Sequence, residues 1–96
     1  MAVTNRDASA QAVSGKTYAD ASIGTDGLQV TGPAAAKAIY AYISAAGTFA
    51  VAGGAAVPLD ATTWVLVWER GEGLPSYPSV LIKPSSGTAT ISLRIV

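Results

Sequence analysis

Residues 62–70 read TTWVLVWER, and this stretch decides the fold class. Read with a period of two, it puts Trp64, Leu66 and Trp68 on one face and the intervening residues on the other. β-Branched and aromatic residues dominate it, as is typical of strands. The pattern predicts a strand buried on both faces. Because both tryptophans of the chain lie on it, much of the core is expected to assemble against it.

The segments on either side also read as short strands separated by turns. Residues 47–52 and 55–59 precede the tryptophan strand, with Pro58 indicating an edge position, and residues 79–83 follow it. Residues 88–96 show the most regular alternation, and their inward-facing set is expected to be Ala89, Ile91, Leu93 and Ile95. This succession of short strands and turns predicts an all-β domain, either a small β-sandwich or a barrel.

Two segments need a closer reading. Asp26-Gly27 is a hairpin turn signal with apolar residues on both sides, and it predicts a short hairpin over residues 22–30. Residues 34–46, AAAKAIYAYISAA, fit either an alanine-rich helix or a strand, and their turn-rich neighbours favour the strand. In the strand alternative, the face opposite the tyrosines holds Ile39, Ala41 and Ile43.

Residues 1–21 are predicted to form an extended or disordered N-terminal arm, and residues 22–96 form the β domain. Apolar side chains are sparse in the arm and follow no period, so burial does not offset the entropy of ordering it. The arm is therefore expected to be disordered when free, or extended across a neighbouring molecule. Its first residues lack an apolar core, and we expect no signal peptide.

The composition indicates a subunit of an assembly, the alternative being a secreted-type β domain with a Ser/Thr-rich surface. The 96 residues carry a net charge of zero, and charged residues make up 12% of the chain, against about 25% in ordinary globular domains. A surface so poor in charge tends to associate. The absence of cysteine and histidine removes disulfides, thiolate metal sites and the commonest general base. The scattered basic residues predict no nucleic-acid partner, and glycines and Pro58 within the uncharged run 38–59 argue against a membrane helix.

No group of residues predicts catalysis, a cofactor or a metal ion. Residues 10–17, AQAVSGKT, fit a relaxed phosphate-loop pattern around Lys16, but the strand before it and the helix after it that such a loop requires are not predicted. Asp60 and Glu69 flank the tryptophan strand, roughly 30 Å apart at about 3.3 Å per residue, which is too far to flank one scissile bond. Of the other acidic residues, Glu72 lies in a solvated loop, and Asp20 and Asp26 lack the spacing of a calcium loop.

Aromatic side chains are candidates for partner contacts. Trp64, Trp68, Tyr40, Tyr42 and Tyr77 offer flat rings that can stack on sugars, although core packing is the first explanation for the tryptophans. The loop over residues 70–78 holds one aromatic residue between prolines, in a position suited to an exposed contact. The residues predicted to contact a partner are Tyr77, Pro75, Arg70, Val3 and Val13.

The whole chain resembles the small β-rich decoration, or cement, proteins of tailed-bacteriophage capsids. The likeness rests on a cysteine- and histidine-free, Ala/Gly/Ser/Thr-rich chain of low charge, an arm over residues 1–21 and a compact β body. It implies a non-enzymatic virion protein, assembled in the host cytoplasm, that forms a homo-oligomer, with a trimer favoured. Its partner would be the major capsid protein or another virion protein, and it would stabilise the shell across subunit joints. The alternative is a small glycan-binding or adhesin-type β module of a phage spike or fibre.

Overall fold

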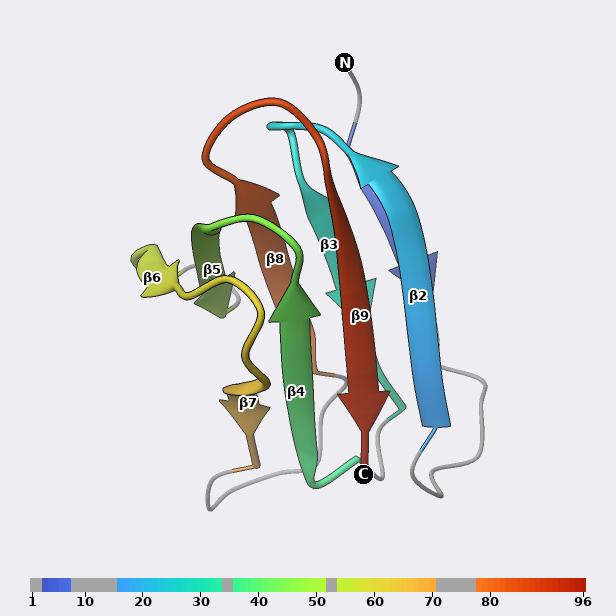
Figure 1. Ribbon diagram of the computed structural model, residues 1–96. Coiled ribbons are helices and arrows are strands. Elements are labelled where there is room, and N and C mark those ends of the chain that lie inside the picture. Colours follow the sequence, from blue (N-terminus) through green and yellow to red (C-terminus); the bar gives the residue numbers. More distant parts are fainter. Residues whose placement is uncertain (1–2, 8–15, 34–35, 52–53, 71–77) are drawn as a thin grey trace.

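The chain folds into two β-sheets that share one core (Figure 1). The computed structural model describes residues 3–7, 16–33, 36–51, 54–70 and 78–96, and within these ranges the regular secondary structure is entirely β-strand. The all-β prediction is therefore confirmed. The described strands are β1 (Thr4–Asp7), β2 (Lys16–Ile23), β3 (Leu28–Thr31), β4 (Ala38–Ile43), β5 (Gly47–Val51), β6 (Val57–Leu59), β7 (Val65–Glu69), β8 (Ser79–Pro84) and β9 (Ala89–Ile95).

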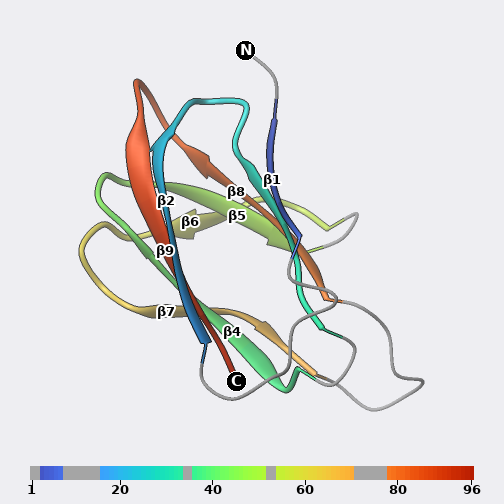
Figure 2. The same cartoon turned by 90° about the vertical axis from the view of Figure 1, so that its right-hand side faces the viewer.

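The strands divide into a sheet of five and a sheet of four. The five-stranded sheet has the order β1-β3-β8-β5-β6, and the four-stranded sheet has the order β2-β9-β4-β7. The β1–β3 pair is parallel, and the other described pairs are antiparallel. Seen at right angles to the first view, the sheets form two layers (Figure 2), and they are not closed into a barrel.

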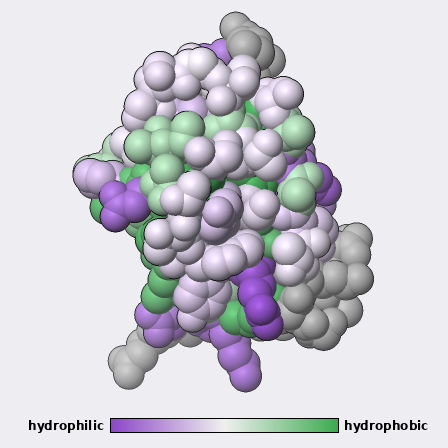
Figure 3. Space-filling model, viewed as in Figure 1, coloured by the Kyte–Doolittle hydropathy of each residue, from purple (hydrophilic) through white to green (hydrophobic). Residues whose placement is uncertain are grey.

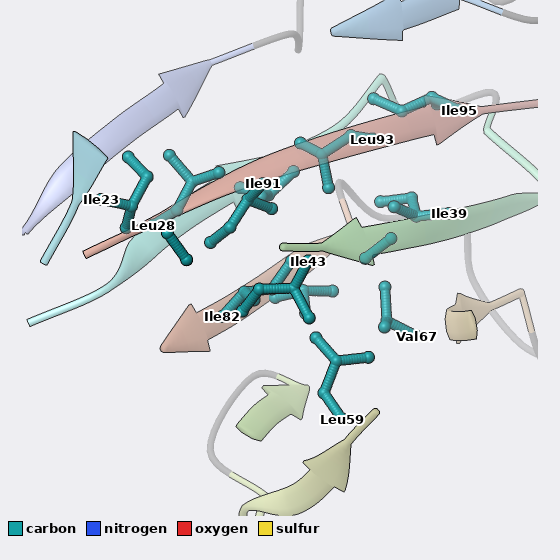
Figure 4. Packing of buried hydrophobic residues seen from close by; sticks show 14 of the residues in the cluster. Ile23, Leu28, Ile39, Ile43, Leu59, Val67, Ile82, Ile91, Leu93 and Ile95 are labelled. Atoms are coloured by element: carbon teal, nitrogen blue, oxygen red, sulfur yellow. The ribbon is translucent and has the colours of Figure 1, made fainter. Parts of the chain in front are cut away.

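The core lies between the two sheets and consists of aliphatic side chains (Figure 4). Ile91 and Leu93 of β9 and Ile82 of β8 all lie in the core between the sheets, and all three side chains are fully buried. The predicted alternation of residues 88–96 is thus confirmed. Residues 38–43 form a strand with Ile39 and Ile43 fully buried, so the strand alternative for this segment is also confirmed. Within the described ranges, no polar or charged residue is buried.

The tryptophan stretch is an edge strand, not the centre of the core. β7 lies at the end of the four-stranded sheet beside β4, and Trp64 and Leu66 are 47% and 40% exposed. Two consecutive residues of β4 pair with Trp68 and Leu66, so Val67 is an extra residue in a β-bulge. The bulge interrupts the alternation: Trp68 packs against the core, whereas Trp64 and Leu66 do not. The predictions of burial on both faces and of one shared face were therefore wrong.

The turn at Asp26-Gly27 joins strands of different sheets. The Gly27 N–H donates to the Gly24 carbonyl at 2.9 Å, and Gly27 has a φ of +94°, which suits glycine. However, β2 pairs with β9, while β3 pairs with β1 and β8, so the hairpin predicted over residues 22–30 is wrong. The chain crosses between sheets here because Ile23 and Leu28 bury their side chains in the common core from opposite layers.

The described part of residues 1–21 lies in the two sheets. β1 and β2 are edge strands of different sheets, and the boundary predicted between residues 21 and 22 falls inside β2. Arg6 of β1 and Asp20 of β2 form an ion pair in which Arg6 Nε lies 3.0 Å from Asp20 Oδ2. This hydrogen bond to Asp20 raises the pKa of Arg6, and the guanidinium also lies 5.1 Å from the ring centroid of Tyr18. The contact, called the clasp here, joins the two sheets along one side.

Candidate interaction surfaces

The first surface is the inner face of β5 and β6 at the side opposite the clasp. Across the five-stranded sheet, Leu28 pairs with Ile82, Ile82 with Phe49, and Phe49 with Val57. Leu28 and Ile82 are fully buried, Phe49 is half-buried and Val57 is 46% exposed. Because directly opposed residues point to the same side of a sheet, all four belong to the inner face. Burial is therefore lost progressively toward β6.

A second pair of opposed residues on β8 and β5 shows the same loss of burial. Val51 of β5 pairs with the fully buried Val80, yet Val51 is 39% exposed. The clasp aligns β1 with β2, and β5 contacts β7. Among the described strands, the four-stranded sheet therefore has no strand that faces β6. Leu59, at the far end of β6, is still buried. We call the uncovered part, consisting of Val51 and Val57, the open margin.

The second surface is the outer face of the four-stranded sheet. Leu66 of β7, Tyr40 of β4 and Arg94 of β9 form one cross-strand row on this face. Next to them, the rings of Tyr42 and Trp64 lie 5.5 Å apart between centroids, with their planes inclined by 51°. Figure 3 views this side of the molecule and shows mostly residues of intermediate hydropathy, with strongly hydrophilic ones few.

A hollow of about 430 Å³ lies on this outer face, and we call it the aromatic hollow. Among the described residues, Tyr40, Trp64, Arg94 and Val96 line it. Arg94 is exposed, and within the described part of the chain its side chain forms no ion pair or hydrogen bond. The arrangement combines exposed aromatic rings with one unpaired cation, which is the composition of a ligand site: mostly apolar walls and few polar groups that fix orientation.

Two of the five predicted contact residues, Arg70 and Val3, lie in the described part of the chain. The Arg70 guanidinium donates from Nε to the carbonyl of Ala36 at 2.8 Å and lies 5.3 Å from the Trp68 ring centroid, so Arg70 holds the edge of the four-stranded sheet. Val3 precedes β1 and is 42% exposed, so it is accessible to a partner. Tyr77, Pro75 and Val13 lie outside the described residues.

The structure also places the residues considered for catalysis. Lys16 begins strand β2, so no helix follows the phosphate-loop pattern. Asp60 follows β6 in the chain, while Glu69 ends β7 of the other sheet, and both are exposed. Among the residues with assigned positions, no three acidic side chains gather as a metal site. The described ranges also contain no helix with the length and apolar character needed to cross a membrane.

The sequence named Tyr40, Tyr42 and Trp64 as rings that can stack on a sugar, but it did not place them beside Arg94 on one face. Alternation in residues 38–43 already separates Tyr40 from the isoleucines, and alternation in residues 88–96 already turns Arg94 outward. What the sequence does not give is the register that sets Tyr40 opposite Arg94, or the bulge that leaves Trp64 outside the core. Comparison with family models, curated proteins and solved structures found no match for this chain. Its function is therefore inferred from its two exposed surfaces.

Proposed function

We propose that the protein is a non-enzymatic structural subunit whose core is completed by a neighbouring protein molecule. The open margin carries this proposal, because Val51 and Val57 occupy inner-face positions and remain 39% and 46% exposed. In this proposal the two sheets form a β-sandwich, open on the side opposite the clasp. The most specific form of the function is that of a capsid decoration protein in a tailed-phage virion. A low charge content of 12%, which suits a surface that is covered in the assembled state, supports it.

The free energy gained by burying the open margin is too small to hold a complex together by itself. Fully burying a valine contributes about 1.5–3 kcal/mol, so covering side chains that are 39% and 46% exposed returns about 1 kcal/mol each. Association costs at least about 4 kcal/mol in lost translational and rotational freedom. The margin therefore anchors a wider contact, and a stable complex buries about 800 Å² on each partner.

The contact uses side chains more than backbone pairing. β6 is an edge strand, and its middle residue, Pro58, has no N–H to donate to an added strand. A neighbour thus meets the margin by packing against Val51 and Val57, not by extending the sheet over its full length. Around a threefold axis, each copy's margin packs on the next copy, and the ring closes. The trimer then binds the major capsid protein across subunit joints.

Co-sedimentation with capsid shells tests this function. Shells assembled from the major capsid protein of the same genome are mixed with the wild-type chain, with Val57→Ser, and with Val3→Ser as a matched variant at a similarly exposed valine. We expect wild type and Val3→Ser to sediment with the shells, and Val57→Ser to bind about fivefold more weakly, which corresponds to the loss of about 1 kcal/mol. Absence of wild-type binding would contradict the decoration function, and equal loss in Val3→Ser would move the contact to the β1 side.

A further inference from the structure

The aromatic hollow is a second surface, independent of the open margin. The margin belongs to the inner face of the five-stranded sheet, whereas the hollow lies on the outer face of the four-stranded sheet. Its volume of about 430 Å³ falls within the range of about 300–1,000 Å³ that small-molecule sites occupy. A protein that uses the margin for assembly therefore keeps the hollow available for another ligand.

We infer that the aromatic hollow binds a sugar that carries a carboxylate, such as a uronic acid. The sugar ring stacks on the exposed rings of Trp64 and Tyr40, and the carboxylate meets the guanidinium of Arg94. This inference goes beyond the proposed function, and its outcome does not depend on whether the protein decorates a shell.

The rings provide a prepared platform for a sugar. Trp64 is 47% exposed and Tyr40 is 36% exposed, so both present flat apolar area to solvent. Tyr42 is half-buried and lies against Trp64 in a tilted arrangement, with centroids 5.5 Å apart. This contact supports the indole from one side and reduces the freedom that binding would otherwise remove. The C–H groups on one face of a pyranose fit such a surface, while the sugar hydroxyls stay in contact with water.

The positive charge of Arg94 favours a sugar that carries a carboxylate over a neutral sugar. Among the described residues of its lining, Arg94 is the one with a charged side chain, and no described acidic side chain pairs with it. A guanidinium presents its N–H donors in a planar fork that matches the two oxygens of a carboxylate. Directly opposite Arg94, the register places Tyr40 on one side and Thr17 on the other, both uncharged. Glu69 lies farther along β7, opposite Ala38, and does not line the hollow.

An NMR titration with paired ligands tests the inference. Methyl β-D-glucuronide and methyl β-D-glucoside share one ring and differ in the carboxylate, so they separate the charge from the stacking surface. The readout is the shift of backbone amides and of the Trp64 and Trp68 indole N–H signals in the full-length protein. We expect the glucuronide to perturb Trp64 and Arg94, and the glucoside to bind about tenfold more weakly, because it lacks the charge-assisted hydrogen bonds.

Variants and one further ligand complete the test. Arg94→Gln is expected to remove the preference for the glucuronide, and Trp64→Ala to weaken both sugars, while Lys83→Gln, which removes an exposed charge on the other sheet, changes neither. The inference is overturned if neither sugar shifts Trp64, if the two sugars bind equally, or if Arg94→Gln keeps the preference. It is also overturned if a short polyglutamate peptide binds as well as the glucuronide, since the hollow would then recognise a protein carboxylate.

Discussion

Two leucine-to-alanine substitutions compare the core with the edge of the same sheet. Leu93 of β9 is fully buried, whereas Leu66 of β7 is 40% exposed, and each substitution removes the same atoms. Leu93→Ala leaves a cavity between the sheets, and such a change typically costs about 2–5 kcal/mol. Leu66→Ala removes a side chain that is already partly in water and leaves no enclosed cavity. Its cost is expected to be about 1 kcal/mol or less.

The difference in unfolding free energy between the two variants is large for a domain of this size. For a chain of 96 residues, each 1 kcal/mol shifts the midpoint of thermal unfolding by about 4–8 °C. Leu93→Ala should therefore lower Tm by about 10 °C or more, and Leu66→Ala by about 5 °C or less. Urea unfolding followed by circular dichroism gives both free energies, with an unchanged m-value showing that the comparison is valid. Equal losses at the two positions would refute the assignment of β7 as an edge strand and β9 as a central one.

Two further substitutions test contacts that hold the fold. Arg6→Met should destabilise the protein by about 1–2 kcal/mol, because it leaves the largely buried Asp20 carboxylate without its cation. Hydrogen exchange should show this loss of stability first in β1. Unchanged protection of the β1 amides would argue against the clasp. Gly27→Ala should cost about 2 kcal/mol or more, since its φ is +94° and an added Cβ would lie 2.8 Å from the Ile82 carbonyl oxygen. Gly87→Ala is the matched control, because φ at Gly87 is +62° and the space around it is open. Urea unfolding is expected to show a smaller loss of stability, about 1 kcal/mol. A loss equal to that of Gly27→Ala would remove the steric argument.

Much of the fold follows from patterns of period two. The alternation of residues 88–96 and of residues 38–43 predicts which side chains enter the core, because each strand has one buried and one exposed face. Pro58 likewise marks β6 as an edge strand, since proline cannot serve in the middle of a sheet. These features depend on the identities of neighbouring residues in one strand, and these identities are read directly from the sequence.

The features that the sequence did not reveal depend on pairing between distant segments. Asp26-Gly27 specifies a turn, but nothing local indicates whether the flanking strands pair with each other or with β9 and β8. The bulge at Val67 arises from the register between β4 and β7, and it alone separates Trp68 from Trp64. β1 and β2 have too few apolar residues to read as strands, and they join the sheets through β3, β9 and the Arg6–Asp20 pair.

The same limit applies to the two interaction surfaces. The open margin exists because five strands face four, which is a property of the topology and not of any segment. The aromatic hollow requires the cross-strand neighbours Tyr40 and Arg94, which are far apart in the chain. Neither surface has a sequence motif, whereas most of the loop predicted over residues 70–78, namely residues 71–77, lies outside the described residues.

The mass of the protein in solution tests the central claim most directly, namely that another molecule covers the open margin. Light scattering over a wide concentration range should show a stable multimer, a trimer in our proposal, for the wild-type chain. The double variant Val51→Ser/Val57→Ser should dissociate toward monomer while keeping its β-sheet circular dichroism spectrum. A wild-type chain that stays monomeric at the highest concentration, or a variant with unchanged mass, would contradict self-association through the margin.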